Sequence, residues 1–237
     1  MNSTIDILAF GAHADDVEIG MGGAIAKFAA SGKRIVICDL TEAELSSNGT
    51  VKTRREEAAS SARVLGVSER VNLQMPDRGL FLREEYIERI VSVIRKYKPL
   101  LIFAPYWEDR HPDHGSCSKL VQEAFFSAGI RNYVSLDGSQ PHKAKNLYYY
   151  MINGYAKPDF VVDVSSYYHV KMESLKAYET QFRLMGDGVG TPLTDGYLEY
   201  IEARERLFGK DSGVGLAEGF MTQRPLIVQN DLFGDPS

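Results

Sequence analysis

The chain has 237 residues, of which 44% are hydrophobic and 25% are charged, and its formal net charge at pH 7 is −5. This balance is typical of a folded globular protein, and the length suits one α/β domain over residues 1–237. A mildly acidic chain without a basic stripe disfavours nucleic acid as a partner and favours a small molecule.

The N-terminal residues indicate neither a signal peptide nor a membrane span. They contain no basic segment, and the apolar run that follows, Ile7–Phe10, is too short for either. The only cysteines are Cys38 and Cys117, which excludes a disulfide framework and a four-cysteine metal site. We therefore expect a cytoplasmic protein that does not interact with membranes.

Six short apolar runs predict buried strands, and amphipathic stretches between and after them predict helices. The expected strands are Ile5–Phe10, Ile35–Leu40, Val71–Met75, Leu100–Ala104, Leu147–Ile152 and Phe160–Val164. The expected helices are Val17–Ala30, Val51–Leu65, Glu84–Tyr97, Ser166–Phe182 and Thr194–Phe208. This alternation predicts a Rossmann-like three-layer α/β/α domain with a mostly parallel sheet. Ligands bind beyond the carboxyl ends of such strands, so the segments after the first and fourth strands are the first candidates for chemistry.

Directly after the first strand the chain reads Gly11-Ala-His-Ala-Asp-Asp-Val-Glu18. If a helix begins near Asp15, the side chains of His13 and Asp16 can converge on one cation while Asp15 points elsewhere. A helix N-terminus favours ionised carboxylates by about 0.3–1 kcal/mol, so both aspartates are expected to be charged at neutral pH. The alternative is structural: the aspartates cap the helix, and His13 is a hydrogen-bonded core histidine.

A dinucleotide site is another common use of a turn between a strand and a helix. Glycines 11, 20, 22 and 23 lie in this region, but their spacing does not match G-x-G-x-x-G. Two carboxylates at the helix N-terminus would also repel a pyrophosphate. We therefore do not expect a nucleotide-dependent oxidoreductase.

The second cluster follows the fourth strand and reads Tyr106-Trp-Glu-Asp-Arg-His-Pro-Asp-His114. Pro112 suits the first turn of a helix that begins near Asp113, which lets His111 and His114 face one cavity. Together with the first cluster, this segment predicts a metal site. His13, Asp16 and His114 supply two nitrogens and one oxygen, a donor set that suits one zinc ion per chain with a position left for water. Iron(II), cobalt and manganese remain alternatives.

The remaining polar residues of the two clusters are candidates for catalysis. Asp15 can take a proton from a water molecule that the metal activates. His111, held by Asp113, can stay an imidazolium and stabilise the oxyanion of a tetrahedral intermediate, an interaction often worth about 3–4 kcal/mol. A helix cap is the alternative role for Asp113.

Together, Ala12-His-Ala-Asp-Asp-Val-Glu18 and His111-Pro-Asp-His114 resemble the signature of the PIG-L/LmbE-like zinc deacetylases. That family usually has proline where this chain has Ala14, a position that is not a ligand. The resemblance spans nearly the whole chain. It implies a zinc site at His13, Asp16 and His114, a base at Asp15, an oxyanion contact from His111 and a sugar contact from Arg54.

Further segments resemble the subgroup that deacetylates N-acetyl-α-D-glucosaminyl L-malate in bacillithiol biosynthesis; they are Thr41–Gly49, Arg54, Met75–Gly79 and Ala217–Phe220. Arg110 is then a candidate partner for a malate carboxylate, and Tyr197 a candidate for closing over the intermediate. Ordinary surface structure is the alternative for both residues. The family also implies a small N-acetyl amino-sugar substrate and a homo-oligomer, with a hexamer as one expected form.

Two other functions remain open from the sequence. The first is deacetylation of another N-acetylglucosamine-containing glycoside or oligosaccharide, which needs the same metal chemistry. The second, from a different class, is a non-catalytic sugar-binding protein. Such a protein would be expected to lack a ligand or the base, whereas this chain retains all of them.

Overall fold

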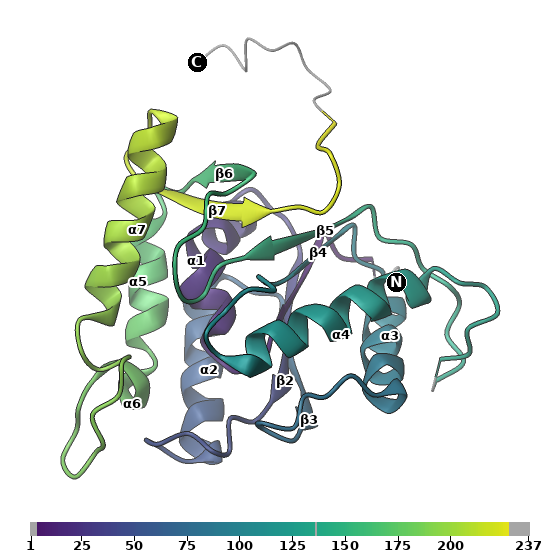
Figure 1. Ribbon diagram of the computed structural model, residues 1–237, viewed down its shortest axis with the longest axis horizontal. Coiled ribbons are helices and arrows are strands. Elements are labelled where there is room, and N and C mark those ends of the chain that lie inside the picture. The colour runs from purple at the N-terminus through teal and green to yellow at the C-terminus, as the bar shows by residue number, and fades with distance from the viewer. Residues whose placement is uncertain (1–3, 136, 228–237) are drawn as a thin grey trace.

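The computed structural model describes residues 4–135 and 137–227, in which seven strands form one sheet (Figure 1). The strands are β1 (Ile7–Gly11), β2 (Ile35–Thr41), β3 (Glu69–Met75), β4 (Leu101–Pro105), β5 (Asn146–Tyr150), β6 (Phe160–Asp163) and β7 (Ala217–Met221). Their order in the sheet is β3-β2-β1-β4-β5-β7-β6. Strands β1 to β5 pair in parallel, and β7 is antiparallel to both of its neighbours. The predicted mostly parallel, Rossmann-like sheet is confirmed.

Helices cover both faces of this sheet. They are α1 (Asp16–Ala30), α2 (Val51–Leu65), α3 (Glu84–Tyr97), α4 (Pro112–Ala128), α5 (Tyr168–Lys176), α6 (Glu179–Phe182) and α7 (Tyr197–Ser212). Figure 1 shows α3 and α4 on one side of the sheet and α1, α2, α5 and α7 on the other. Among the described residues, no helix is both long and apolar enough to cross a membrane.

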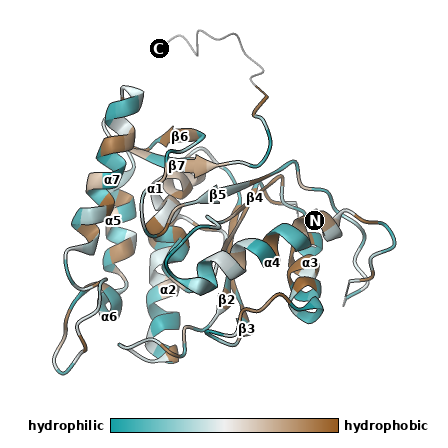
Figure 2. Cartoon of the chain, in the orientation of Figure 1, coloured by the Kyte–Doolittle hydropathy of each residue, from teal (hydrophilic) through white to brown (hydrophobic). Residues whose placement is uncertain are grey.

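The core consists of two hydrophobic clusters, one on each face of the sheet. Successive strand residues point to opposite faces, so Leu8 and Phe10 pack with α3 and α4 while Ile7 and Ala9 pack with α1 and α2. Hydrophobic colour in Figure 2 accordingly lies on the strands between the helical layers, whereas the helices carry both colours. The result is the three-layer α/β/α arrangement that the sequence predicted.

Strand β7 is absent from the prediction because Glu218 and Gly219 interrupt its apolar pattern. In the structure Glu218 is buried against Lys171, with Oε1 2.7 Å from Nζ. At Gly219, a Cβ atom would lie 2.9 Å from side-chain carbons of Met151 and Phe208, so only glycine fits there. Both residues are compatible with a strand only because of partners far away in the chain.

The C-terminal helices also differ from the prediction. The expected helix at Ser166–Phe182 divides into α5 and α6 at Tyr178, whose ψ of 63° is not helical. Its hydroxyl donates a hydrogen bond to Glu18 at 2.8 Å, a tertiary contact that local periodicity does not reveal. The expected helix at Thr194–Phe208 begins instead at Tyr197 and continues to Ser212.

Helix α1 bends at Met21, whose φ of −148° and ψ of 23° are not helical. The bend leaves some backbone groups of α1 without hydrogen-bond partners in the helix. The side chains of a buried ion pair take the place of those partners. Lys171 Nζ donates to the carbonyl of Ile19 at 2.8 Å, and Glu218 accepts from the amide of Gly23 at 2.9 Å. Since Lys171 and Glu218 also bind each other, one ion pair fixes the angle between the two parts of α1.

The glycines near the first turn serve packing rather than nucleotide binding. A Cβ atom on Gly20 would lie 2.0 Å from the ring of Tyr150, so this glycine lets α1 approach β5 closely. Dinucleotide-binding folds use an acidic residue about 20 positions after the glycine-rich turn for the ribose. In this region Asp39 is buried and accepts two hydrogen bonds from Arg70, at 2.7 and 2.9 Å, so it is not available for a ribose.

We expect Lys171→Met to lower the free energy of unfolding by about 3–5 kcal/mol, because removing one partner of a buried ion pair leaves its counter-charges unpaired. Both Glu218 and Glu205 bind Lys171 in this buried cluster. As a control, Lys33→Met removes a half-exposed contact with Asp6 and should cost less than about 1 kcal/mol. Urea unfolding followed by circular dichroism measures both variants. Equal stability of the two variants would contradict this role of Lys171.

Candidate active site

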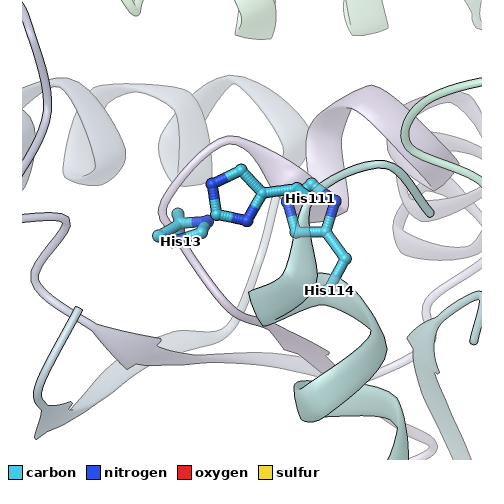
Figure 3. A group of neighbouring side chains, drawn as sticks. All are labelled: His13, His111 and His114. Atoms are coloured by element: carbon cyan, nitrogen blue, oxygen red, sulfur yellow. The ribbon is translucent and has the colours of Figure 1, made fainter. Parts of the chain in front are cut away.

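The candidate site lies at the carboxyl edge of the sheet, beyond β1 and β4. These strands are parallel neighbours, so the segments that follow them leave the sheet at the same edge. His13 comes from the turn after β1, and His111 and His114 come from the start of α4 (Figure 3). The ring centroid of His13 lies 4.9 Å from that of His111 and 5.6 Å from that of His114. The structure thus brings together the two polar clusters that the sequence singled out.

The carboxylate of Asp16 lies between two of these rings. Its Oδ1 is 3.1 Å from Nε2 of His114, and its Oδ2 is 3.7 Å from Nδ1 of His13. The amide of His13 also donates to Oδ2 at 2.9 Å. Burial alone would raise the pKa of Asp16, but His114 and His13 hold it well below its usual range. The three residues predicted to bind metal therefore face one another.

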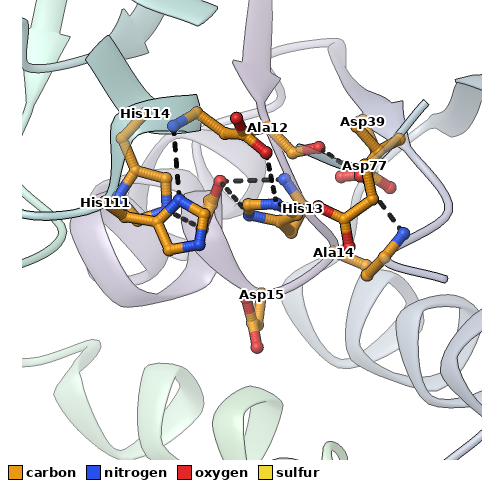
Figure 4. A network of polar contacts seen from close by, with 12 residues as sticks. Ala12, His13, Ala14, Asp15, Asp39, Asp77, His111 and His114 are labelled. Atoms are coloured by element: carbon orange, nitrogen blue, oxygen red, sulfur yellow. Dashed lines mark hydrogen bonds and ion pairs between the residues drawn. The ribbon is translucent and has the colours of Figure 1, made fainter. Parts of the chain in front are cut away.

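Each of the two histidines meets another carboxylate at its other ring nitrogen. His13 Nε2 lies 3.2 Å from Asp77 Oδ1 and 3.6 Å from Asp113 Oδ2 (Figure 4). His114 Nδ1 lies 3.0 Å from Asp109 Oδ1. This contact is an ion pair, because its angle does not fit a hydrogen bond. Metal-binding histidines are commonly oriented by carboxylates in this way.

These carboxylates favour positive charge between them. Burial lowers the pKa of His114, but Asp16 and Asp109 raise it to about 9. Burial also lowers the pKa of His13. Asp113 and two further aspartates outweigh this effect and hold the pKa of His13 well above its usual value. Protons on the imidazoles or a bound cation can supply this charge.

In the described part of the chain, two overlapping groups of side chains could hold a metal ion. Within each group the ligand atoms lie within 4.8 Å of one another; the groups are His13, His111 and His114, and His13, Asp77 and Asp113. Asp16 contacts two histidines of the first group. Imidazole nitrogens and carboxylate oxygens together suit zinc and iron(II), so the donor set fits a divalent transition metal.

Asp15 lies apart from the histidine rings (Figure 4). It is the N-cap of α1 but makes no capping hydrogen bond, and its φ of 113° is strained for a residue other than glycine. Arg54 Nη1 holds it there by donating to Asp15 Oδ2 at 3.0 Å and to the carbonyl of Ala14 at 2.8 Å. Burial raises the pKa of Asp15 to about 7 against the opposing charge of Arg54. The charge of Asp15 therefore depends on Arg54 and on any cation bound nearby, and its full ionisation at neutral pH stays a prediction.

His111, rather than Asp113, caps helix α4, because its Nδ1 accepts a hydrogen bond from the Asp113 amide at 3.3 Å. The Asp113 carboxylate binds Arg78 through that residue's amide at 2.8 Å and its Nη1 at 2.9 Å. Burial, followed by the charges of His114 and His13, lowers the pKa of His111. The Asp113 carboxylate is thus engaged by Arg78, while the His111 ring accepts from the helix backbone, and the imidazolium expected at His111 stays a prediction.

A pocket of about 320 Å³ opens over these side chains, and its wall includes the three predicted substrate-binding residues, Arg54, Arg110 and Tyr197. Arg110 is exposed and makes no hydrogen bond or ion pair with the residues that the structure describes. The hydroxyl of buried Tyr197 donates to Asn153 Oδ1 at 2.9 Å. Tyr197 is thus fixed in the pocket wall, and its closing over an intermediate stays a prediction.

The sequence alone indicated no role for Asp77 or Asn153, and no specific one for Asp109. Asp109 accepts hydrogen bonds from the amide and the side chain of Asn153, at 3.0 and 2.9 Å, and these hold its carboxylate beside His114. Asp77 and Asp109 both lie in polar segments that follow a strand, which was a usable signal. Only the tertiary contacts distinguish them from neighbouring acidic residues.

The chain is similar to proteins of one enzyme family. The chain matches the family model PIG-L, GlcNAc-PI de-N-acetylase, over residues 8–125. It is 31% identical over 231 residues to a diacetylchitobiose deacetylase of Thermococcus kodakarensis, covering 92% of this chain and 83% of that protein. This chain, with its α/β fold and its histidines and aspartates at the edge of the sheet, is thus similar in sequence to a deacetylase. The chain belongs to the PIG-L family.

Two solved structures share the fold over most of their length. A conserved protein of Thermus thermophilus is 32% identical, with a TM-score of 0.89 and coverage of 98% of this chain and 100% of that one. The N,N′-diacetylchitobiose deacetylase of Pyrococcus horikoshii, complexed with an inhibitor, is 25% identical, with a TM-score of 0.79 and coverage of 91% and 82%. The family resemblance is confirmed, whereas the closer resemblance to the malate-specific subgroup stays a prediction.

We expect Asp109→Ala to weaken metal binding by about 10- to 100-fold, because His114 loses the carboxylate that orients its ring. Competition with a chromophoric chelator measures this affinity without reference to activity. Glu108→Ala is the matched control, since it removes the neighbouring, exposed carboxylate. If both variants bind metal as tightly as the parent protein, Asp109 does not orient His114.

Proposed function

We propose that this chain is a zinc-dependent N-deacetylase that releases acetate from an N-acetylglucosamine unit of a glycoside or oligosaccharide. The main support is the position of Asp16 between His13 and His114 in a pocket that also contains Asp15. Membership of the PIG-L family supports the reaction, and the names of the diacetylchitobiose deacetylases support the substrate. They favour an oligosaccharide over the malate conjugate to which the sequence first pointed.

His13, Asp16 and His114 are the proposed ligands, with zinc as the proposed ion and iron(II) as the alternative. When bound, the ion supplies a Lewis acid that polarises the acetyl carbonyl and activates a water molecule. Asp77 and Asp109, at the outer ring nitrogens of the two histidines, keep the rings turned toward Asp16.

The other residues of the pocket handle the proton and the developing charge. Asp15, oriented by Arg54, takes a proton from the attacking water as the new carbon–oxygen bond forms. His111, whose Nδ1 accepts from the helix backbone, donates a hydrogen bond from Nε2 to the carbonyl oxygen. Asp15 then returns the proton to the glucosamine nitrogen as the carbon–nitrogen bond breaks, which leaves acetate and a free amine.

A non-catalytic sugar-binding protein is the alternative from a different class. It would bind N-acetylglucosamine derivatives but release no acetate. A buried carboxyl group beside an arginine, in addition to the metal-binding side chains, supports the enzyme because sugar binding alone does not need a base. The cytoplasmic location and the homo-oligomer, with a hexamer as one form, stay predictions.

Asp15→Ala should retain the metal and lose turnover by about 10²- to 10⁴-fold, because only the proton-transfer group is removed. His13→Ala should lose the metal itself. Elemental analysis of the purified variants, together with an assay of released acetate, separates the two effects. A metal-loaded Asp15→Ala variant with the parent rate would show that Asp15 is not the base.

Acetate release from three substrates tests the substrate proposal. We expect N,N′-diacetylchitobiose to react with a higher kcat/KM than N-acetylglucosaminyl-malate or free N-acetylglucosamine, and chelation of the metal to abolish all activity. A clear preference for the malate conjugate would restore the interpretation that the sequence favoured. Tight binding of all three without acetate release would indicate the sugar-binding alternative.

A further inference from the structure

We propose that a second pocket beside the active site binds the neighbouring sugar ring of the substrate against Tyr155 and Tyr106. This inference rests on the proposed deacetylase function and adds where the rest of an oligosaccharide lies. The second pocket has a volume of about 310 Å³, close to the 320 Å³ of the active-site pocket. Each volume lies at the lower end of the range for ligand pockets, as expected for one ring in each.

The two pockets have a common wall, because Arg110 and Asn153 line both of them. Asn153 is fixed at this boundary: its side-chain nitrogen donates to Asp109 at 2.9 Å, and its oxygen accepts from Tyr197 at 2.9 Å. Arg110 has no partner within the described residues and can reach hydroxyl groups on either side. Ligands in the two pockets would therefore contact the same two residues, Arg110 and Asn153, from opposite sides.

Aromatic rings line this second pocket. Tyr155 is 54% exposed, and its ring stacks on Phe208 with centroids 5.5 Å apart and an angle of 24°. Tyr106 packs against Trp107 with centroids 4.6 Å apart. A pyranose has C–H groups on its faces and hydroxyl groups around its edge, so its face packs on an aromatic ring while polar side chains bind its edge.

The segment that carries Tyr155 is held in place by helix α7. Tyr200 donates a hydrogen bond to the carbonyl of Gly154 at 2.8 Å, and Arg204 donates to the carbonyl of Ile152 at 2.8 Å. These contacts come directly before Tyr155 in the chain. A ring that is already fixed loses little conformational freedom when a ligand packs on it, which favours binding.

The charges around the second pocket favour a neutral ligand. Its lining contains two carboxylates, Glu108 and Asp109, and one arginine, Arg110. Asp109 is already paired with His114, so Glu108 is the carboxylate that would repel a malate unit, whereas a neutral sugar ring meets no such repulsion. The second pocket therefore suits a second sugar unit better than it suits malate.

Another pocket also adjoins the active site, through Ser47 and Asn48. Its volume is about 370 Å³, and no aromatic ring is among the described residues that line it. Asn48 is already engaged there by the backbone of Val189, at 2.8 Å in both directions. This pocket is a competing location for a second ring, and its exposed Met185 provides a matched control.

The test compares Tyr155→Ala, Tyr155→Phe and Met185→Ala. With N,N′-diacetylchitobiose, Tyr155→Ala should raise KM about tenfold with little change in kcat, because one aromatic contact of the substrate is lost. With N-acetylglucosamine, which has one ring, its kinetics should stay within about twofold of the parent protein. Tyr155→Phe retains the ring and should behave as the parent on both substrates, as should Met185→Ala. Thermal unfolding checks that each variant is folded.

Calorimetric binding of N,N′-diacetylchitobiose to the Asp15→Ala protein, with and without Tyr155→Ala, makes the test independent of turnover. A tenfold weaker affinity in the double variant supports the second pocket. It does so even if the parent protein releases no acetate, because a lack of acetate release would reject only the proposed reaction. Two calorimetric results would reject the second pocket: unchanged affinity in the double variant, or no binding of the disaccharide at all. Two kinetic results would also reject it: equal losses of activity on the one-ring and two-ring substrates in Tyr155→Ala, or a loss in Met185→Ala alone.

Discussion

The contact of the Asp16 carboxylate with both His13 and His114 is the interaction on which the rest of the site depends. Asp15 and Asp16 are adjacent in the sequence, and their like charges would repel each other if they shared one environment. The strained backbone at Asp15 separates them, so that Asp16 faces the histidines and Asp15 faces Arg54. Each carboxyl group thus has its own positively charged partner, which allows two acidic groups with different roles at one helix N-terminus.

The same helix N-terminus explains how a Rossmann-like fold can hold a cation. In dinucleotide-binding proteins the backbone amides at this position bind the pyrophosphate. Here the side chains of Asp15 and Asp16 lie at that position, and a helix N-terminus favours their negative charge. Aspartates in place of a bound phosphate make the position attractive to a cation, so the chemistry differs while the β1–α1 geometry is retained.

Buried charges fix the helix that carries these aspartates. Glu18, one turn further along α1, accepts hydrogen bonds from Arg70, Ser61 and Tyr178 at 2.5 to 2.8 Å. Lys171 and Glu218 satisfy the backbone at the bend of the helix. Buried polar groups are unfavourable without partners, so these contacts, which reach Glu18 through its Oε1, favour one orientation of α1. The position of Asp16 is therefore determined by residues from α2, β3, α5 and β7.

The sequence by itself determined the layered fold, the two polar clusters and the family, because apolar periodicity and the spacing of histidines and aspartates are local properties. Helices α2 and α3 have the bounds that their periodicity predicted. The tertiary structure decided what depends on distant partners. Glu218 lies in a strand because Lys171 pairs with it, and Asp113 binds Arg78 while the ring of His111 caps α4. Asp77 and Asp109 also acquire their roles only through contact with histidines, since charge state and orientation depend on neighbours in space.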